Sequence, residues 1–207
     1  MTDDPDTDER AAGRNTPAAA RRAADSDRVF VVDPDEIEAG TDPLGIGDGT
    51  APVGSYVLVY SLGSAATMTV GALGAATFPP GAYAYVGSAF GSNGLGRVDR
   101  HRRVASGDHD VTHWHIDYFG SNPDATLDSV VAVPREDVEC RLATEIADRR
   151  SPAVSAPLEG FGASDCACAT HFLGGVDSAG DTDSPANSES DTLGVTAVDV
   201  AVSVIRS

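Results

Sequence analysis

The chain contains no lysine, so all 14 of its basic residues are arginine, and 32 acidic residues give it a net charge of −18. Aspartate supplies 24 of the 32 acidic residues, and large hydrophobic side chains are sparse beside Ala, Gly and Val. Such a surface stays hydrated at high salt, which predicts a halophilic archaeon as the host. In molar salt the Debye length is only about 3 Å, so the acidic charge does not exclude nucleic acid as a partner.

Long apolar segments are missing as well. The sequence has no run of about 18 apolar residues, and its N-terminus lacks the charged-then-apolar pattern of an export signal. We therefore expect a cytoplasmic protein without a membrane partner. Only three cysteines are present, and in a reducing compartment a disulfide between Cys166 and Cys168 would be strained.

Two low-complexity regions flank a central one. Residues 1–50 are rich in Asp, Ala, Gly and Arg and show no sustained apolar period, so we expect them to be disordered. Residues 174–207 begin with an acidic linker and end in LGVTAVDVAVSVI, which predicts a strand able to pair with a sheet edge. The remaining residues, 54–173, have the size of a single domain.

The pattern within the central region predicts an α+β fold. Residues 55–62 alternate apolar side chains on one face of a strand, and residues 65–87 supply further strands separated by Gly and Pro. Helices are predicted over 95–105 and 134–150, while residues 111–119 fit either a strand or a short helix. We expect a small, mainly antiparallel sheet with an added hairpin, flanked by two or three helices. In the last helix, the proline at position 134 would occupy the first turn.

The most informative stretch of the sequence is residues 83–103. It reads as an alternating aromatic strand, a glycine-rich turn and a helix start that carries four arginines. Arg97, Arg100 and His101 fall on one face of that helix, and Arg103 follows them. This concentration of donors predicts a phosphate site, because the planar fork of an arginine bonds two phosphate oxygens at once. The alternative is a solvated helix face.

An acidic residue lies within the apolar arc of the helix predicted at 134–150. The arc consists of Val138, Leu142, Ala143 and Ile146. Glu139 falls inside this arc, and a carboxylate in an apolar setting needs a partner, so we expect a metal ion or an arginine beside it. The alternative is that Glu139 reaches solvent or pairs with Arg135, four residues earlier.

A second group of chemically distinctive residues follows a Gly-Phe-Gly loop. Cys166, Cys168 and His171 place three soft or borderline metal ligands within six residues. Zinc would need a fourth ligand. The candidates are His113, His115, Asp165 and Cys140. The alternative is two small buried thiols and a histidine satisfied by the backbone. If zinc binds, a zinc-stabilised interaction domain is one functional hypothesis.

Together these motifs resemble those of the GIY-YIG nuclease superfamily, and in particular a branch that is sometimes joined to endonuclease III-type repair enzymes. Gly54-Ser55-Tyr56 stands in place of the first motif and Tyr85-Val86-Gly87 in place of the second. Arg97 and His101 match the Arg-x-x-x-His helix of the family, and Glu139 matches its late acidic residue. The branch is indicated by YAYVGSA at 83–89, HWHIDYF at 113–119 and GFGASDCACATHF at 160–172.

The sequence departs from the family in two ways. Tyr56 and Tyr85 are 29 residues apart, further than the usual gap between the two motifs, so an added hairpin must be accommodated between the two strands. Ser55 replaces an apolar residue of the first motif, which we expect to affect packing more than chemistry.

The resemblance implies a metal-dependent DNA endonuclease that hydrolyses phosphodiester bonds, with DNA repair as its expected setting. By resemblance, Tyr56 would be the base or its relay, and Tyr85 would shape the site. Arg97 would clamp the phosphate, and His101 would orient a group or handle a proton.

The resemblance also implies a metal ion and a nucleic-acid substrate. By resemblance Glu139 would bind the cation, and one carboxylate with waters and phosphate oxygens suits Mg²⁺ or Mn²⁺. Arg100 and Arg103 are expected to contact the substrate, which would be DNA or RNA. The alternative function is a catalytically inactive nucleic-acid-binding module on the same fold.

Overall fold

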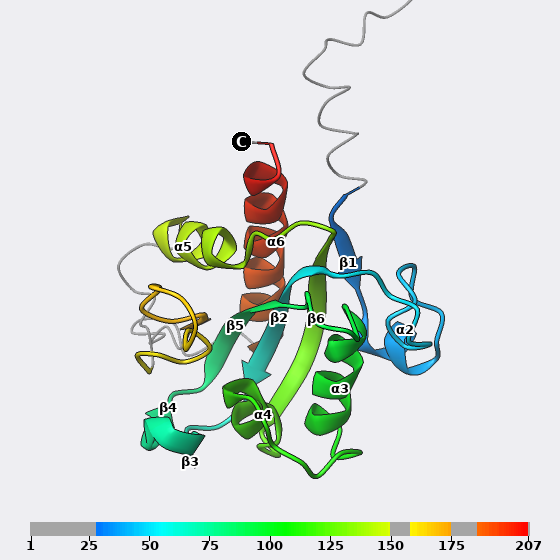
Figure 1. The fold of residues 1–207 in the computed structure, drawn as a ribbon. Coiled ribbons are helices and arrows are strands. Elements are labelled where there is room, and N and C mark those ends of the chain that lie inside the picture. Colours follow the sequence, from blue (N-terminus) through cyan, green and yellow to red (C-terminus); the bar gives the residue numbers. More distant parts are fainter. Residues whose placement is uncertain (1–27, 150–157, 175–185, 207) are drawn as a thin grey trace, which may run out of the picture.

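The computed structural model describes residues 28–149, 158–174 and 186–206 of the chain. Its elements, drawn in Figure 1, are β1 (Phe30–Val32), α2 (Pro34–Glu38), β2 (Gly54–Leu62), β3 (Ala66–Thr69), η1 (Gly71–Leu73), β4 (Ala75–Phe78), β5 (Gly81–Ser88), α3 (Gly96–Ala105), α4 (His115–Gly120), β6 (Ala125–Pro134), α5 (Glu139–Arg149), β7 (Phe172–Gly174) and α6 (Ala186–Val204).

An antiparallel sheet with the strand order β1-β6-β2-β5-β7 forms the centre of the molecule. Strands β3 and β4 form a separate two-stranded hairpin that lies between β2 and β5 in the sequence. The expected α+β fold with a mainly antiparallel sheet and an added hairpin is confirmed. Because β2 and β5 pair directly despite the insertion, Tyr56 lies opposite Gly87, and Leu58 lies opposite Tyr85.

Both faces of the sheet are buried, because alternate side chains of each strand enter two different cores. Tyr56 and Leu58 of β2 belong to the core that includes residues of α3 and α4. Val57 and Val59 belong to the other core, which is covered by α5 and α6. Figure 1 shows the resulting three layers, with α3 and α4 in front of the sheet and α6 behind it.

The C-terminal segment is a helix, so the predicted C-terminal strand is wrong. Along α6 the buried residues are Leu193, Ala197, Val200, Ala201 and Val204. This spacing of four, three, one and three residues follows the period of a helix and forms a single stripe against β2, β5 and β6. The richness in valine favoured a strand, but burial against the sheet follows the helical period instead. Of the predicted linker, residues 175–185 lie outside the described residues.

Part of the region that we expected to be disordered has regular structure. Strand β1 pairs with β6 at the sheet edge, and α2 begins with a capping box between Asp33 and Glu36. After the helix, Asp42 accepts hydrogen bonds from the backbone N–H groups of Leu44, Ile46 and Gly47. These features depend on single residues and not on a repeating apolar pattern, which explains why the search for such a pattern did not reveal them. Residues 1–27 lie outside the described residues.

The helix expected from residue 134 begins later, at Glu139. Pro134 is the last residue of β6 and lies opposite Gly54, so its predicted place in the first helical turn is wrong. Between the strand and the helix, the hydroxyl of Ser55 donates to the carbonyl of Glu136 and accepts from the backbone N–H of Val138. The polar residue of the first motif therefore fixes the start of α5 against β2.

The structure contains helices in both of the other segments for which a helix was considered. The helix predicted at 95–105 is α3, and residues 111–119 contain the short helix α4 rather than a strand. Within the described parts of the chain, no helix has the length and apolar character needed to cross a membrane.

The packing of α6 can be tested by placing a charge on its buried or its exposed face. Ala197→Asp puts a carboxylate at a position with 0% exposure, and we expect a loss of about 3 kcal/mol in the free energy of unfolding. Val195 on the same helix is 63% exposed, so Val195→Asp should change the stability by no more than about 0.5 kcal/mol. Urea unfolding in molar KCl, followed by circular dichroism, measures both. Equal stability of the two variants would contradict the packing of α6 on the sheet.

Candidate functional site

A pocket of about 390 Å³ opens where β5, α3, α5 and the loop before β7 meet. Its lining combines cationic, acidic and aromatic side chains with the backbone of glycine-containing loops. The lining residues are Tyr85, Ser88, Phe90, Gly91, Arg97, His113, Trp114, His115, Glu139, Gly162, Ser164 and Asp165.

The structure brings three of the predicted site residues to this pocket and places two directly behind it. Tyr85, Arg97 and Glu139 line the pocket. Tyr56 is 1% exposed and His101 is 2% exposed, and neither lines the pocket. The centroids of the Tyr56 and Tyr85 rings are 6.3 Å apart, so the two phenols from neighbouring strands lie next to each other, with Tyr85 at the pocket and Tyr56 behind it.

The glycine of the second motif makes room for Tyr56. A Cβ atom on Gly87 would lie 2.5 Å from Tyr56 Oη, because the phenol ring crosses the backbone of β5 at this residue. Only glycine permits that approach without displacing the ring.

Tyr56, His101 and Asp117 form a hydrogen-bonded chain beneath the pocket. Tyr56 Oη is 3.1 Å from His101 Nε2, and His101 Nδ1 is 2.9 Å from Asp117 Oδ1. The second oxygen of Asp117 accepts from the backbone N–H groups of His113 and Trp114, at 2.8 Å and 2.9 Å. The chain links β2 to α3 and α4.

The burial and hydrogen bonding of these groups determine which of them carry protons. Burial alone would raise the pKa of Asp117, but the hydrogen bonds from His101, Trp114 and His113 outweigh it and hold the pKa well below its usual range. Burial lowers the pKa of His101 more than Asp117 raises it, and burial raises the pKa of Tyr56 well above 10. At neutral pH, a neutral His101 therefore donates a hydrogen bond from Nδ1 to an ionised Asp117 and accepts a hydrogen bond at Nε2 from the Tyr56 hydroxyl.

The predicted arginines have three different environments. Arg97 Nη1 donates to the carbonyl of Ser88 at 2.6 Å, and its guanidinium lies 4.8 Å from the centre of the Trp114 ring. Arg100 donates to Asp117 and to a backbone carbonyl and also contacts Trp114, so it supports the Asp117 carboxylate. The solvated helix face proposed as an alternative is therefore wrong for Arg97 and Arg100.

Arg103 is on the outer side of α3. Its side chain is 43% exposed, it lies 4.0 Å from Asp99, and it does not line the pocket. Arg100 lines a smaller adjoining cavity of about 250 Å³ together with Arg97 and Trp114, but Arg103 does not. The structure thus separates the two arginines that we expected to bind substrate together.

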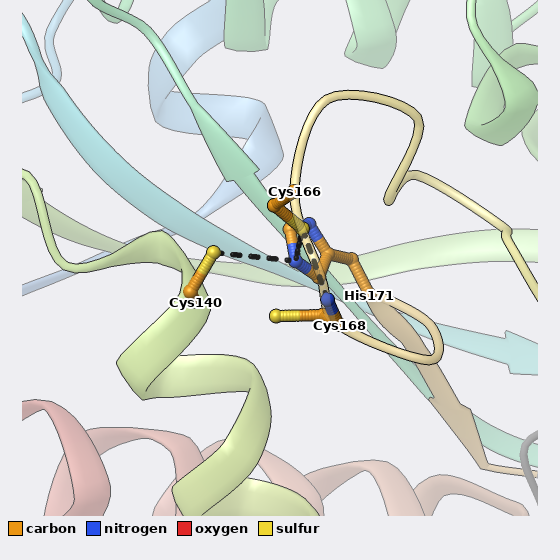
Figure 2. Close-up of side chains that lie close together, drawn as sticks. All are labelled: Cys140, Cys166, Cys168 and His171. Atoms are coloured by element: carbon orange, nitrogen blue, oxygen red, sulfur yellow. Dashed lines mark hydrogen bonds between the residues drawn. The ribbon is translucent and has the colours of Figure 1, made fainter.

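The cysteine and histidine motif forms a cluster that could bind a metal ion. Cys140, Cys166, Cys168 and His171 each offer one ligand atom, and these four atoms lie within 4.8 Å of one another. Figure 2 shows the Cys140 and Cys166 sulfurs pointing toward the His171 ring. Of the four candidate fourth ligands, the structure brings only Cys140 into the cluster. Sulfur and nitrogen donors suit zinc better than magnesium.

Glu139 joins this cluster to the pocket. Its Oε1 lies 3.3 Å from His171 Nδ1 and its side chain is 19% exposed, so the side chain beside it is a histidine and not Arg135. Burial alone would lower the pKa of His171, but the nearby Glu139 carboxylate outweighs it and raises the pKa. An imidazole, which the sequence analysis did not consider, is thus the side chain beside Glu139, and the metal ion expected there stays a prediction.

Sequence reasoning missed two residues with important positions. Asp117 was contained in a motif used only for the resemblance, and nothing in the sequence connected it to His101. Trp114, whose ring contacts the guanidinium groups of Arg97 and Arg100, also belongs to that motif and was given no role of its own. The signal that could have identified Asp117 is an acidic residue in an otherwise aromatic and apolar segment, where a buried charge needs partners.

Comparison with known proteins gives one match. The family model described as "Domain of unknown function DUF123" matches residues 55–189. The match covers more than half of the chain, so the chain belongs to the DUF123 family. No curated protein and no solved structure matches it significantly. The resemblance to GIY-YIG nucleases therefore rests on the motifs alone.

The buried carboxylate predicts a specific dependence of stability on pH. Because the pKa of Asp117 is lowered by folding, its stabilising contribution is present above about pH 4, the pKa of an unfolded aspartate, and is lost as the pH falls through the folded-state value. We expect Asp117→Asn to lower the free energy of unfolding by about 3 kcal/mol at pH 7. The difference from wild type should shrink below pH 4. Urea unfolding across this range measures it.

Asp108 provides the matched control for this measurement, because it is exposed at the end of α3. Asp108→Asn should change the stability at pH 7 by no more than about 0.5 kcal/mol. A difference between wild type and Asp117→Asn that stayed constant down to pH 2 would contradict the ionised state assigned to Asp117.

Proposed function

We propose that this DUF123 family member is a metal-dependent endonuclease that hydrolyses phosphodiester bonds in DNA, with DNA repair in the cytoplasm as its biological setting. The main support is that a guanidinium, a phenol and a carboxylate from three different elements line one pocket, with a Tyr-His-Asp chain directly behind it. The motif resemblance to GIY-YIG nucleases supports the same conclusion.

Arg97 is the residue proposed to bind the scissile phosphate. Among the described residues, one of its five N–H groups is hydrogen-bonded, to the Ser88 carbonyl, and Trp114 supports the guanidinium plane. The remaining donors can bond two phosphate oxygens and stabilise the charge that develops on them. Phe90, which is 44% exposed at the same pocket, offers a ring on which a nucleobase can stack.

The Tyr-His-Asp chain is proposed to manage a proton. In this proposal Tyr56 would take a proton from the attacking water as it passes its own phenolic proton to His101 Nε2, and the ionised Asp117 would stabilise the imidazolium that results. Tyr85 lies between this chain and the pocket and is proposed to orient the attacking water and the substrate.

Two different metals suit two different groups of residues. Glu139 and Asp165 line the pocket and provide oxygen donors that fit Mg²⁺ or Mn²⁺, which would stabilise negative charge on the phosphate and the leaving oxygen. The cluster of three cysteines and His171 provides the soft donors that fit Zn²⁺.

One observation favours a second candidate function, a nucleic-acid-binding module without catalytic activity. Tyr56 is 1% exposed and its hydroxyl is engaged by His101, so the phenol does not reach the pocket in this conformation. In this alternative Arg97 still binds phosphate, while no group activates the water. DNA or RNA would be the ligand in either case.

Substitutions on α3 and α5 distinguish the two candidates. With plasmid DNA, Mg²⁺ and molar KCl, Arg97→Ala and Glu139→Gln should each reduce nicking by about 10³-fold, because each removes stabilisation of the developing charge. Only Arg97→Ala should also weaken DNA binding, measured by fluorescence anisotropy under the same conditions.

The matched controls are Arg103→Ala on α3 and Glu145→Gln on α5, because their side chains are 43% and 44% exposed and neither lines the pocket. Both should retain nicking within about twofold. A wild-type protein that binds DNA but does not nick it with Mg²⁺ or Mn²⁺ would support the binding module, and nicking at the wild-type rate by both pocket variants would contradict the enzyme.

A further inference from the structure

We infer that Cys140, Cys166, Cys168 and His171 bind one Zn²⁺ ion and that the bound ion positions Glu139 in the pocket through the His171 ring. The metal site itself stands on geometry alone. The consequence for cleavage rests on the proposed function, because it uses the role proposed for Glu139.

The distances within the cluster suit a single tetrahedral ion. Zinc bonds of about 2.3 Å to sulfur and about 2.0 Å to nitrogen place two sulfurs about 3.8 Å apart, and a sulfur and a nitrogen about 3.5 Å apart. His171 Nε2 is 3.4 Å from Cys166 Sγ and 3.9 Å from Cys140 Sγ, and all four ligand atoms lie within 4.8 Å of one another. The cluster therefore has the size of one coordination sphere.

The ligands come from segments that the fold holds in place independently. Cys140 is in the first turn of α5, whose start is fixed by Ser55. The backbone N–H of His171 donates to the carbonyl of Phe161 at 2.7 Å, and its carbonyl accepts from the N–H of Val86 on β5 at 2.9 Å. An ion bound here would fasten the loop of residues 158–171 to α5 and to the sheet.

The His171 ring faces the cluster with one nitrogen and the pocket with the other. Nε2 is directed at the sulfurs of Cys140 and Cys166, and Nδ1 lies 3.3 Å from Glu139 Oε1. The ring is fully buried, and among the described residues its Nδ1 makes no hydrogen bond of good geometry. A metal on Nε2 fixes the tautomer that carries the proton on Nδ1, and this proton then bonds the carboxylate, as in carboxylate–histidine–zinc sites.

Two adjacent residues of α5 thus contact opposite sides of one imidazole. Cys140 lies on the metal side and Glu139 on the pocket side. When one carboxylate oxygen of Glu139 is held by His171, the other is left for a cation in the pocket. Zinc occupancy would therefore set the orientation of Glu139, and His171 is a positioning residue.

The metal site is tested on the full-length protein purified in molar KCl with a phosphine reductant. We expect one zinc per chain by mass spectrometry of the metal, and zinc absorption-edge spectra that fit three sulfur ligands and one nitrogen ligand. Replacement of zinc by Co²⁺ should give the charge-transfer and visible bands of a tetrahedral thiolate site. Wild-type protein without stoichiometric zinc, or with another ion at one per chain, would overturn the site.

Variants test which residues hold the ion. Cys166→Ser and Cys168→Ser should each lower zinc affinity at least 100-fold in competition with a chromogenic chelator, while His113→Ala, a pocket histidine outside the cluster, should leave it unchanged. Because a cysteine variant can fail to fold, the wild-type spectra decide the ligand set on their own. Full zinc affinity in both cysteine variants would also overturn the assignment.

The link to Glu139 has a readout that does not involve cleavage. Glu139→Ala should weaken zinc binding about 10-fold to 100-fold, which is the usual effect of removing the partner of a ligating histidine. Glu145→Ala, on the same helix and away from the cluster, is the control. Zinc affinities of the two variants within twofold of each other would overturn the link.

A final measurement separates this inference from the proposed function. If the protein nicks DNA, removal of zinc by the chelator should raise the Mg²⁺ concentration needed for half-maximal nicking about tenfold, and added zinc should restore it. If removal of zinc does not change the Mg²⁺ concentration needed for half-maximal nicking, the positioning role of His171 is overturned and the proposed nuclease activity stands. A protein that binds zinc and shows the Glu139 link, but does not nick DNA, would refute the nuclease and leave the metal site.

Discussion

The Asp117 carboxylate is 1% exposed, and a charge buried to this extent is stable only if all of its acceptor sites are used. It receives hydrogen bonds from His101, from Arg100 and from the backbone N–H groups of His113 and Trp114. These contacts join α3 to α4, select the tautomer of His101, and place the indole against which two guanidinium groups lie. The satisfaction of one buried charge thus helps to place Arg97, whose other contact is the Ser88 carbonyl.

A second group of contacts organises the opposite side of the pocket. Ser55 fixes the start of α5, the first turn of α5 presents Glu139 and Cys140, and His171 lies between them. Both groups depend on the same sheet, because Tyr56 and Ser55 are neighbours in β2 and point to opposite faces. The pocket is formed where the two groups meet, with the arginine on one side and the carboxylates on the other.

Several features of the fold could be predicted because they depend on local repeats of apolar residues and on turn-forming residues. The alternation of Tyr56 and Leu58 predicted the central strand, and the turn before residue 95 predicted the start of α3. The failures have equally local causes. The valine-rich C-terminal segment contains strand-forming residues, but its apolar residues are spaced as in a helix. Burial of these residues against the sheet stabilises the helix. The start of α5 was misplaced because Pro134 is compatible both with a first helical turn and with the end of a strand.

The sequence by itself determined the α+β class with a mainly antiparallel sheet and the residue types at the candidate site, since these follow from hydrophobic periods, turn residues and motif order. Only the tertiary structure decided which of those residues meet. It placed Arg97 at the pocket and Arg103 outside it, moved Tyr56 into the layer behind, and selected Cys140 among four candidates to complete the cluster. Contacts such as His101 with Asp117, or Glu139 with His171, join residues 16 and 32 positions apart on different elements. No local period encodes such distances, because they are set by how the helices pack on the two faces of the sheet.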